Sequence, residues 1–382
     1  MQTRKRYYED CLLREFEAQV LRCEPVEQCY EITLDATAFY PEGGGQASDK
    51  GTLGDVSVLS VREQGETVIH LCTGALPVGS TVKGTLDWEH RFDQMQQHTG
   101  EHIVSGIVHR LFGFDNVGFH VGSDVITVDF DGIIPQEALP QIEAEANRVV
   151  WQNLPLHCWY PEPEELPRVG YRTKRALPWP VRIVEIPGVD KCACCGVQVA
   201  QTGQIGVIKL FSCVKFHQGV RIEMACGGRA LALLNAAYDQ NRQVSQAFSA
   251  KVLETGEAAR AMNKRLADAE YRAQCLQYQL FDTVAAGYQG KGAVLLYRPD
   301  CPPADLRELA DRIARVCGGT AFVYSGSENK YNICLVSKTD DLKELGKALK
   351  ERFGARGGGK PGYFQGTLEA SSQELESFFP IS

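Results

Sequence analysis

The sequence has no long hydrophobic run. No stretch of its 382 residues approaches the length of apolar chain that a membrane-spanning helix requires. The first residues, Met1-Gln-Thr-Arg-Lys-Arg-Tyr-Tyr, lack the apolar core of a secretory signal peptide. These two absences argue against an integral membrane protein and against a secreted one, and we expect a cytoplasmic protein.

The sequence also lacks an excess of positive charge. Its formal net charge is −8 at pH 7, which argues against a protein that coats nucleic acid. Phosphate binding depends on where the charges lie, however, so a local basic groove stays open. Five basic residues form either a solvated face or such a phosphate contact. They are Arg168, Arg172, Lys174, Arg175 and Arg182.

The fourteen cysteines do not indicate a disulfide framework. They are scattered along a large chain without an export signal, and a disulfide framework belongs to small secreted domains. We expect reduced thiols, most of them small core residues, with a few metal ligands among them.

The apolar pattern divides the chain into four expected domains. Residues 1–90 alternate apolar and polar positions between turn signals, which predicts a β-rich, barrel-like domain interrupted by a glycine run. Residues 91–232 mix helices over 91–111 and about 136–152 with several strands, which is typical of an α+β domain. The expected fold class is therefore α+β and multidomain.

The second half of the chain has a different pattern. Residues 233–285 are expected to be helical, because apolar residues recur at spacings of three and four. This arm is a coiled-coil dimer contact, a spacer, or a pair of helices packed on their own domain. Residues 286–382 alternate strands and helices, which predicts a C-terminal α/β domain.

Two histidines lie four residues apart within the first expected helix, at His98 and His102. At this spacing both imidazoles lie on one helix face and can reach a single divalent ion, although buried or shallow surface pairs also occur. Cys194, in a distant cysteine-rich turn, can add a thiolate and complete most of a tetrahedral zinc shell. A zinc protease is not indicated, because Thr99 stands where its glutamate would directly follow the first histidine.

Several segments together resemble one family, the editing domain of alanyl-tRNA synthetase and its free-standing AlaX-type relatives. The C-terminal segment resembles the domain that alanyl-tRNA synthetase shares with the DHH phosphoesterases. The aminoacylation domain of the synthetase has no counterpart in this sequence. The segments are Thr37-Ala-Phe-Tyr-Pro-Glu-Gly-Gly-Gly-Gln46, Met95-Gln-Gln-His98-Thr-Gly-Glu-His102, Cys194-Cys-Gly-Val-Gln198, Arg221-Ile-Glu-Met-Ala-Cys-Gly-Gly-Arg-Ala230 and Arg356-Gly-Gly-Gly-Lys360-Pro-Gly-Tyr-Phe-Gln-Gly.

The resemblance implies a trans-editing hydrolase that deacylates mischarged tRNA(Ala), chiefly seryl-tRNA(Ala) and also the glycyl form, with one Zn²⁺ per chain. It implies His98, His102 and Cys194 as metal ligands and as the centre of catalysis. Gln198 stands where the family has a final histidine, and we expect it to line or complete the shell as a weak neutral ligand. Glu101, directly before the second ligand, is expected to point elsewhere on the helix.

Gln198 leaves alternatives open. Cys192 or Cys195 could supply a second thiolate in its place, or water could fill the position. If the metal is lost instead, the chain would be a catalytically impaired tRNA-binding module that keeps the editing fold.

The resemblance also implies a substrate site near the first glycine run. The Thr37 hydroxyl is expected to meet the serine side chain of the substrate, which would discriminate against alanine. Gln46 is expected to hold the ester region or the loop itself. The backbone of the run is expected to approach the 3′ end of the tRNA closely. The glycines are Gly43, Gly44 and Gly45.

Arg356 and Lys360 flank the C-terminal glycines, where backbone amides and cations suit a phosphate or nucleobase contact. The sequence has no Asp-His-His motif, so a phosphoesterase would lack its metal ligands. We expect this domain to bind the tRNA or to form a homodimer contact, as the helical arm also could.

Overall fold

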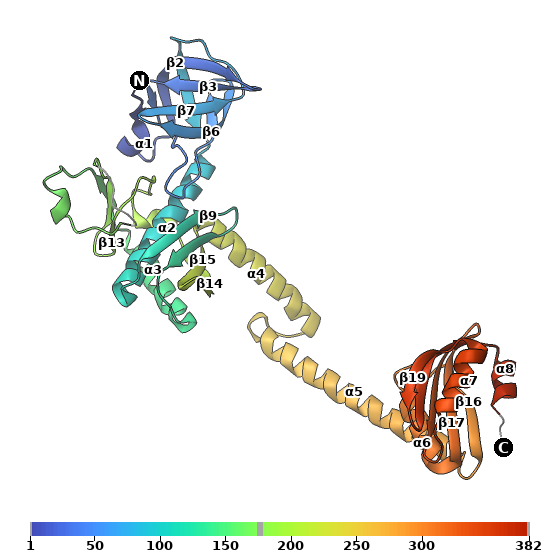
Figure 1. Cartoon of the computed structure of the whole chain (residues 1–382). Helices are drawn as coiled ribbons and strands as arrows, with labels where there is room; N and C mark the ends of the chain where they lie inside the picture. Colours follow the sequence, from blue (N-terminus) through green and yellow to red (C-terminus); the bar gives the residue numbers. More distant parts are fainter. Residues whose placement is uncertain (1, 174–178, 380–382) are drawn as a thin grey trace. The chain divides into compact units, whose positions relative to one another are not determined.

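The computed structural model describes residues 2–173 and 179–379. The chain divides into two compact units, Met1–Gln243 and Val244–Ser382. Each unit combines helices with sheets (Figure 1), so the expected mixed, multidomain architecture is confirmed. The finer division into four domains stays a prediction. Among the described residues, no helix is both long and apolar enough to cross a membrane.

The first unit begins with a closed barrel of antiparallel strands in the order β2-β3-β7-β6-β5-β8 (Figure 1). Side chains alternate between its two faces, and β2 turns Phe16, Ala18 and Val20 into the core. The strands are β2 (Glu15–Val26), β3 (Cys29–Leu34), β5 (Gly51–Leu53), β6 (Val56–Gln64), β7 (Thr67–Cys72) and β8 (Thr81–Leu86). Beside them, β1 (Arg4–Lys5) pairs with β4 (Ala36–Thr37) and continues into α1 (Arg6–Glu9).

The barrel leads directly into the helix α2 (Trp88–Phe112). The helix begins at Asp87, whose carboxylate accepts a hydrogen bond from the backbone N–H of His90 at 3.1 Å. It ends at Gly113, which adopts the left-handed conformation at φ 73°. Two glycines allow close packing of α2 against neighbouring segments. A Cβ at Gly100 would stand 2.2 Å from the Cys226 Sγ, and a Cβ at Gly106 would stand 2.4 Å from the Val189 carbonyl oxygen.

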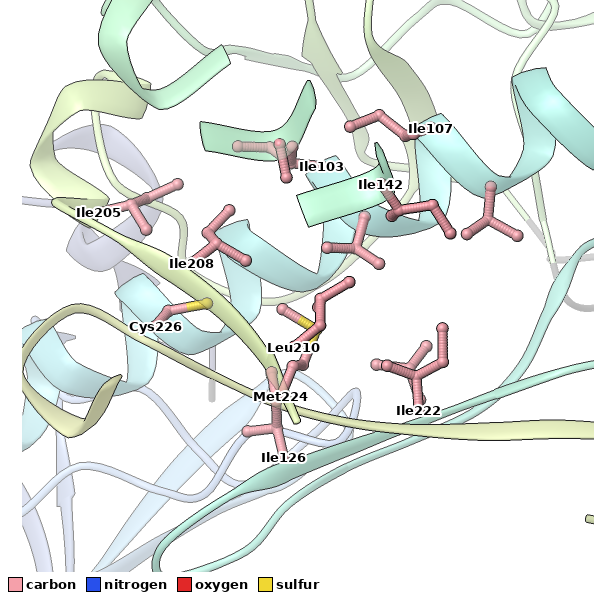
Figure 2. Packing of buried hydrophobic residues seen from close by; sticks show 14 of the residues in the cluster. Ile103, Ile107, Ile126, Ile142, Ile205, Ile208, Leu210, Ile222, Met224 and Cys226 are labelled. Atoms are coloured by element: carbon pink, nitrogen blue, oxygen red, sulfur yellow. The ribbon is translucent and has the colours of Figure 1, made fainter. Parts of the chain in front are cut away.

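A four-stranded sheet in the order β14-β15-β10-β9 packs with α2 and α3 (Leu139–Gln152) around the main core. Figure 2 shows isoleucines of both helices turned toward side chains of the sheet. The strands are β9 (Asn116–Val121), β10 (Ile126–Phe130), β14 (Ile208–Phe216) and β15 (Gly219–Cys226). Short 3₁₀ helices η1 (Gln136–Ala138), η2 (Leu166–Arg168) and η3 (Thr202–Ile205) lie in the connections.

A smaller antiparallel sheet completes the first unit, in the order β11-β12-β13. Its strands are β11 (His157–Trp159), β12 (Ile183–Ile186) and β13 (Asp190–Ala193). Strand β13 contacts α2 and ends directly before Cys194. This sheet therefore carries the cysteine-rich turn to the helix that bears the two histidines.

The second unit is a five-stranded sheet in the order β16-β17-β18-β20-β19 with helices packed on it. The strands are β16 (Gly292–Tyr297), β17 (Gly318–Ser327), β18 (Lys330–Ser337), β19 (Arg356–Lys360) and β20 (Tyr363–Glu369). The helices are α6 (Leu306–Cys317), α7 (Lys343–Phe353) and α8 (Ser372–Phe378). Helix α4 (Gly227–Phe248) belongs to the first unit as far as Gln243, and η4 (Val252–Glu254) and α5 (Thr255–Ala286) precede the sheet in the second unit.

Candidate metal centre and substrate cavity

The structure brings together the two histidines and the distant cysteine. One ligand atom from each of His98, His102 and Cys194 lies within 4.8 Å of the other two. The imidazole rings are stacked with centroids 5.2 Å apart, and the Cys194 Sγ lies 3.3 Å from the His98 Nε2. Both histidines are buried and Cys194 is half-buried. Three donors therefore converge on a space that one cation could occupy.

The other nitrogen of each imidazole is held by a hydrogen-bond acceptor. The His98 Nδ1 lies 2.9 Å from the Gln46 Oε1, and the His102 Nδ1 lies 3.1 Å from the Asp190 Oδ2. Arg172 holds the other carboxylate oxygen of Asp190 at 2.8 Å. Amide and carboxylate oxygens only accept, so each Nδ1 carries a proton, and each Nε2 is the nitrogen that could present a lone pair to a bound cation. This second layer of contacts is the arrangement that orients histidines toward a metal.

The charges of the site also fit a cation. Burial opposes ionisation of Cys194, but the neighbouring His98 and His102 outweigh it and hold the pKa of the thiol well below its usual range. Burial would lower the pKa of His102, but Cys192, Cys194 and Asp190 outweigh it and raise that pKa well above its usual value. A bound divalent cation would replace such protons. Two imidazole nitrogens and one thiolate form a donor set that suits Zn²⁺.

Gln198 lies beside Cys194 but with its amide oxygen engaged elsewhere. Its Nε2 donates to the Cys194 Sγ at 3.6 Å, and its Oε1 accepts a hydrogen bond from the Thr99 hydroxyl at 2.8 Å. The expectation that Gln198 lines the site agrees with this placement. Its role as a metal ligand stays a prediction, because the ligating oxygen would have to leave Thr99.

The two other cysteines of the turn occupy different places. The Cys192 Sγ lies 2.9 Å from the His102 Nδ1, on the side of the ring already bonded to Asp190. Burial raises the pKa of the Cys192 thiol to about 12. Cys195 is exposed, and its Sγ lies 3.8 Å from the Tyr40 hydroxyl. Neither thiol belongs to the convergent set of His98, His102 and Cys194, but Cys192 forms a second, fully buried group of possible ligands with His102 and Asp190, so its role as an alternative ligand stays open.

Thr37 lies in the interior of the first unit, beside a buried histidine. Its side chain is fully buried, and its hydroxyl lies 2.8 Å from the Nε2 of His70. His70 in turn contacts the Ile32 carbonyl through its Nδ1 at 3.0 Å. Thr37 is not among the described residues that line the cavity, and its expected contact with the serine side chain of the substrate stays a prediction. Its position in a motif could not show that another buried residue would engage the hydroxyl.

Gln46 is almost completely buried and contacts the candidate metal site through the His98 imidazole. Its Oε1 accepts from the Val197 backbone N–H at 3.1 Å as well as from His98. Gly196 makes this contact possible, because a Cβ there would stand 2.1 Å from the His98 Cε1. Gln46 is therefore placed to position a ligand and to hold the loop, which is one of the two expected roles, and a contact with the ester region stays a prediction.

The glycine run forms part of the wall of a cavity. Gly43 and Gln46 exchange backbone hydrogen bonds at 3.1 and 3.0 Å, which closes a tight turn. Gly44 and Gly45 line the cavity, and Gly43 does not. Gly45 has a φ of 83°, and a Cβ there would stand 2.6 Å from the Phe119 ring, whose centroid lies 5.0 Å from that of His98.

The cavity has a volume of about 710 Å³ and reaches the convergent donors. This volume lies within the range of about 300–1,000 Å³ that small-molecule sites occupy. Glu101 also lines it, against the expectation that this residue points elsewhere. Its Oε1 accepts hydrogen bonds from the Ser105 hydroxyl at 2.5 Å and from the Asn116 amide.

The basic residues of the first unit do not form one surface. Arg182 is buried and donates to the carbonyl oxygens of Cys194 and Gly196 at 3.0 and 2.8 Å. Arg172 holds Asp190, as described above. These two arginines therefore support the cysteine turn, and the expectation of a solvated face does not apply to them. Lys174 and Arg175 lie outside the described residues.

Arg356 and Lys360 belong to β19 of the second unit and are exposed. Lys360 lines a cavity of about 250 Å³ together with Lys343, Lys347 and Lys350. Four lysines around one depression make a local positive surface on a chain of net negative charge.

Two family models match the first unit. Residues 7–90 match class II (A) tRNA synthetases, and residues 181–223 match the second additional domain of threonyl and alanyl tRNA synthetases. An alanine--tRNA ligase of Thermofilum pendens is 33% identical over 96% of this chain, although the chain spans only 42% of that ligase.

Two editing proteins match over nearly their whole length. The alanyl-tRNA editing protein AlaX-L of Pyrococcus horikoshii is 27% identical over 97% of this chain and 95% of its own. The alanyl-tRNA editing protein Aarsd1 of Mus musculus is 27% identical over 96% and 95%. The chain therefore belongs to the family of AlaX-type alanyl-tRNA trans-editing proteins.

Proposed function

We propose that this protein hydrolyses the aminoacyl ester of mischarged tRNA(Ala), chiefly seryl-tRNA(Ala) and also glycyl-tRNA(Ala). The observation that carries the proposal is the convergence of His98, His102 and Cys194 at a cavity large enough for the end of an aminoacyl-tRNA. The names of the full-length relatives support the same activity.

One Zn²⁺ per chain would be held by His98, His102 and Cys194, with Gln198 beside them. When bound, the metal would supply Lewis acidity toward the ester carbonyl or toward water. Gln46 and Asp190 keep the two imidazoles in the required tautomer and orientation. Gln198 and the Gly196 backbone N–H donate to the Cys194 sulfur at 3.6 and 3.3 Å, which favours its ionised form.

The cavity wall offers two kinds of contact to a substrate. Gly44 and Gly45 have no side chains, so the ester region can approach their backbone closely. Glu101 places a buried carboxylate near the ligands, where it could accept hydrogen bonds from the aminoacyl group. We propose that discrimination between serine and alanine arises at this wall, where the Glu101 carboxylate can accept a hydrogen bond from a serine hydroxyl that alanine lacks.

The second unit is proposed to contact the tRNA backbone through Arg356, Lys360 and the lysines of α7. Positive side chains around a depression suit phosphates and give no sequence preference by themselves. Their loss would weaken tRNA binding while leaving the chemistry of the first unit intact.

A second candidate is a tRNA-binding module that retains the fold without chemistry. The observation that favours it is Gln198, whose amide oxygen is turned to Thr99 where the family resemblance leads us to expect a histidine ligand. Such a protein would bind tRNA(Ala) but would not release serine from it.

Metal analysis and deacylation together test the proposal. The purified protein is expected to contain one zinc per chain and to release serine from seryl-tRNA(Ala) faster than alanine from alanyl-tRNA(Ala). His102→Ala should lower both the metal affinity and the deacylation rate. The fall should exceed the roughly 10–100-fold that is typical when only a residue hydrogen-bonded to a metal ligand is removed. His157→Ala, at an exposed position of β11, is the matched control and should retain both. Binding of tRNA without turnover by the intact protein would decide for the second candidate.

A further inference from the structure

The cavity of the first unit is larger than an aminoacyl group alone requires. Its volume of about 710 Å³ lies in the range of whole small-molecule sites, so a nucleoside can enter together with its ester. The glycine run and Glu101 belong to the lining near the proposed metal ligands. Another part of the lining is aromatic and includes Tyr8 and Tyr160. The hydrolysis proposed above gives this aromatic part no role.

Tyr160 is the exposed ring of the aromatic part. It directly follows β11 (His157–Trp159) and is 47% exposed. The Tyr8 ring meets it edge to face, with centroids 6.4 Å apart. Tyr8 is fixed in turn, because its hydroxyl donates to the Cys195 carbonyl at 2.6 Å and the Arg182 guanidinium lies 4.5 Å above its ring. A ring held against a fixed neighbour loses little conformational entropy when another ring stacks on it.

Trp179 adds a second exposed ring near the first. It is 55% exposed, and its indole Nε1 donates to the Pro161 carbonyl at 3.3 Å. Pro161 directly follows Tyr160, and Pro180, which directly follows Trp179, lines the cavity. Two large exposed aromatic rings therefore lie near each other at the rim of one cavity. Such a grouping on the surface of a protein marks a binding site.

The Phe119 ring also lines the cavity but is engaged elsewhere. Its centroid lies 5.0 Å from that of the His98 imidazole, and it packs closely on Gly45, where a Cβ would stand 2.6 Å away. Phe119 therefore supports the candidate metal centre. Tyr160 is the ring that remains open to a ligand.

We propose that Tyr160 and Trp179 form a stacking platform for the bases at the 3′ end of the tRNA, with the terminal adenine on Tyr160 and the preceding base on Trp179. The proposal rests on the hydrolysis proposed above, since the ester of the terminal ribose must reach the convergent donors. The 3′ end of a tRNA is single-stranded, and successive bases of single strands stack on aromatic side chains. Tyr160 belongs to the described lining and Trp179 lies beyond it, which gives the order of the bases.

The charge beside the platform suits the sugar–phosphate backbone that joins the two bases. Arg182 lines the cavity and donates to the carbonyl oxygens of Cys194 and Gly196. Both acceptors are neutral, so these contacts leave the positive charge of the guanidinium in place. Lys5 lines the cavity as well, but it pairs with Glu63 at 2.5 Å. A nucleotide phosphate near Arg182 would therefore meet a cation that needs no carboxylate displaced.

Binding of a short RNA to the full-length protein tests the platform without any need for turnover. The probe is an uncharged RNA hairpin with the acceptor stem of tRNA(Ala) and its CCA end. Tyr160→Ala should weaken binding by roughly 5- to 100-fold, as expected for the loss of one base–aromatic stack. Tyr160→Phe keeps the ring and should bind like the wild type. Trp151→Ala, which removes a 74% exposed tryptophan of α3, is the matched control and should change nothing.

Altered RNA shows which base uses which ring. Removal of the terminal base, with its ribose kept, should weaken binding to the wild type by a similar factor. The same removal should leave binding to Tyr160→Ala almost unchanged, because the contact is already lost. Trp179→Ala should be insensitive in the same way to removal of the preceding base. Circular dichroism checks that each variant keeps the fold.

The outcomes separate this proposal from the hydrolytic one. A Tyr160→Ala protein that binds as tightly as the wild type overturns the platform, as does one that still loses affinity when the terminal base is removed. A Trp179→Ala protein that stays fully sensitive to the preceding base overturns the second half of the platform. A wild type that shows both couplings but releases no serine contradicts the hydrolysis and leaves the platform standing.

Discussion

The two long helices α2 and α5 differ in how much of their surface is buried. Helix α2 buries almost every residue from Gln94 to Val108, including histidines, glutamines and a glutamate. Helix α5 is longer but buries only Phe281 and Ala285. Polar side chains in α2 are tolerated in the interior because each has a specific partner, such as Gln46 for His98. In α5, by contrast, large apolar side chains such as Leu266 and Leu276 are exposed.

Among the contacts behind the candidate ligands, the largest expected effect comes from the loss of the Asp190 charge. Asp190→Asn removes the charge that holds the His102 Nδ1 and that pairs with Arg172. Metal affinity, measured by competition with a chelator, is expected to fall by about 10–100-fold, with a parallel fall in deacylation. Glu185→Gln, which loses an ion pair with Lys191 on the same small sheet, is the control and should change neither. Unchanged metal affinity in Asp190→Asn would mean that the buried partners of α2 do not support the site.

Matched glycine substitutions in the two helices compare their packing directly. A Cβ at Gly106 of α2 would stand 2.4 Å from a backbone oxygen, so Gly106→Ala should cost about 1–3 kcal/mol of unfolding free energy. Near Gly256 of α5 the nearest atom is 3.7 Å away, at the end of the Arg260 side chain. Gly256→Ala should be neutral or stabilising by at most about 1 kcal/mol. Calorimetry of both variants measures the change in unfolding free energy. Equal changes in the two variants would contradict the difference in burial between α2 and α5.

A buried histidine outside α2 gives a third comparison through pH. Burial lowers the pKa of His70 to about 4, partly opposed by its hydrogen bond to the Ile32 carbonyl. Between that value and about 6.5 the unfolded chain binds more protons than the folded one, so stability falls as the pH drops through this window. Lowering the pH from 7 to 5 should cost about 2 kcal/mol through this residue alone.

Denaturant unfolding at the two pH values measures this cost. His70→Gln should show a smaller loss between pH 7 and pH 5 than the wild type, whereas His157→Gln at an exposed position should behave like the wild type. A wild-type loss that persists undiminished in His70→Gln would assign the pH dependence to other groups.

The helical part of the site could be predicted from the sequence. A spacing of four places His98 and His102 on one face, and the helix that carries them extends over Trp88–Phe112 against an expected 91–111. The difference at its start arises because Asp87 caps the helix. The assignment of Cys194 as the third ligand depended, by contrast, on the family resemblance. The spacing of residues far apart in the sequence does not show which loop contacts the helix.

The contacts behind the ligands could not be predicted. Asp190 faces His102 because β13 pairs with β12 and packs against α2, and that register is a property of the folded sheet. The contact between Thr37 and His70 could not be predicted either, because His70 lies on a strand that is remote in the sequence. Glu101 was misjudged because a helical wheel gives a direction but not the extent of the cavity, which reaches beyond the two histidines.

The hydrogen bond between Gln46 and His98 has a consequence for how the protein is made. Gln46 precedes α2 by some forty residues, and Cys194 follows the end of α2 by about eighty. The loop of Gln46, the helix and the cysteine turn must therefore fold against each other before the proposed ligands could bind an ion. During translation the cation can be acquired only after the cysteine turn has emerged from the ribosome. A shorter chain that begins at α2 would lack the tether on one imidazole and should load its metal poorly.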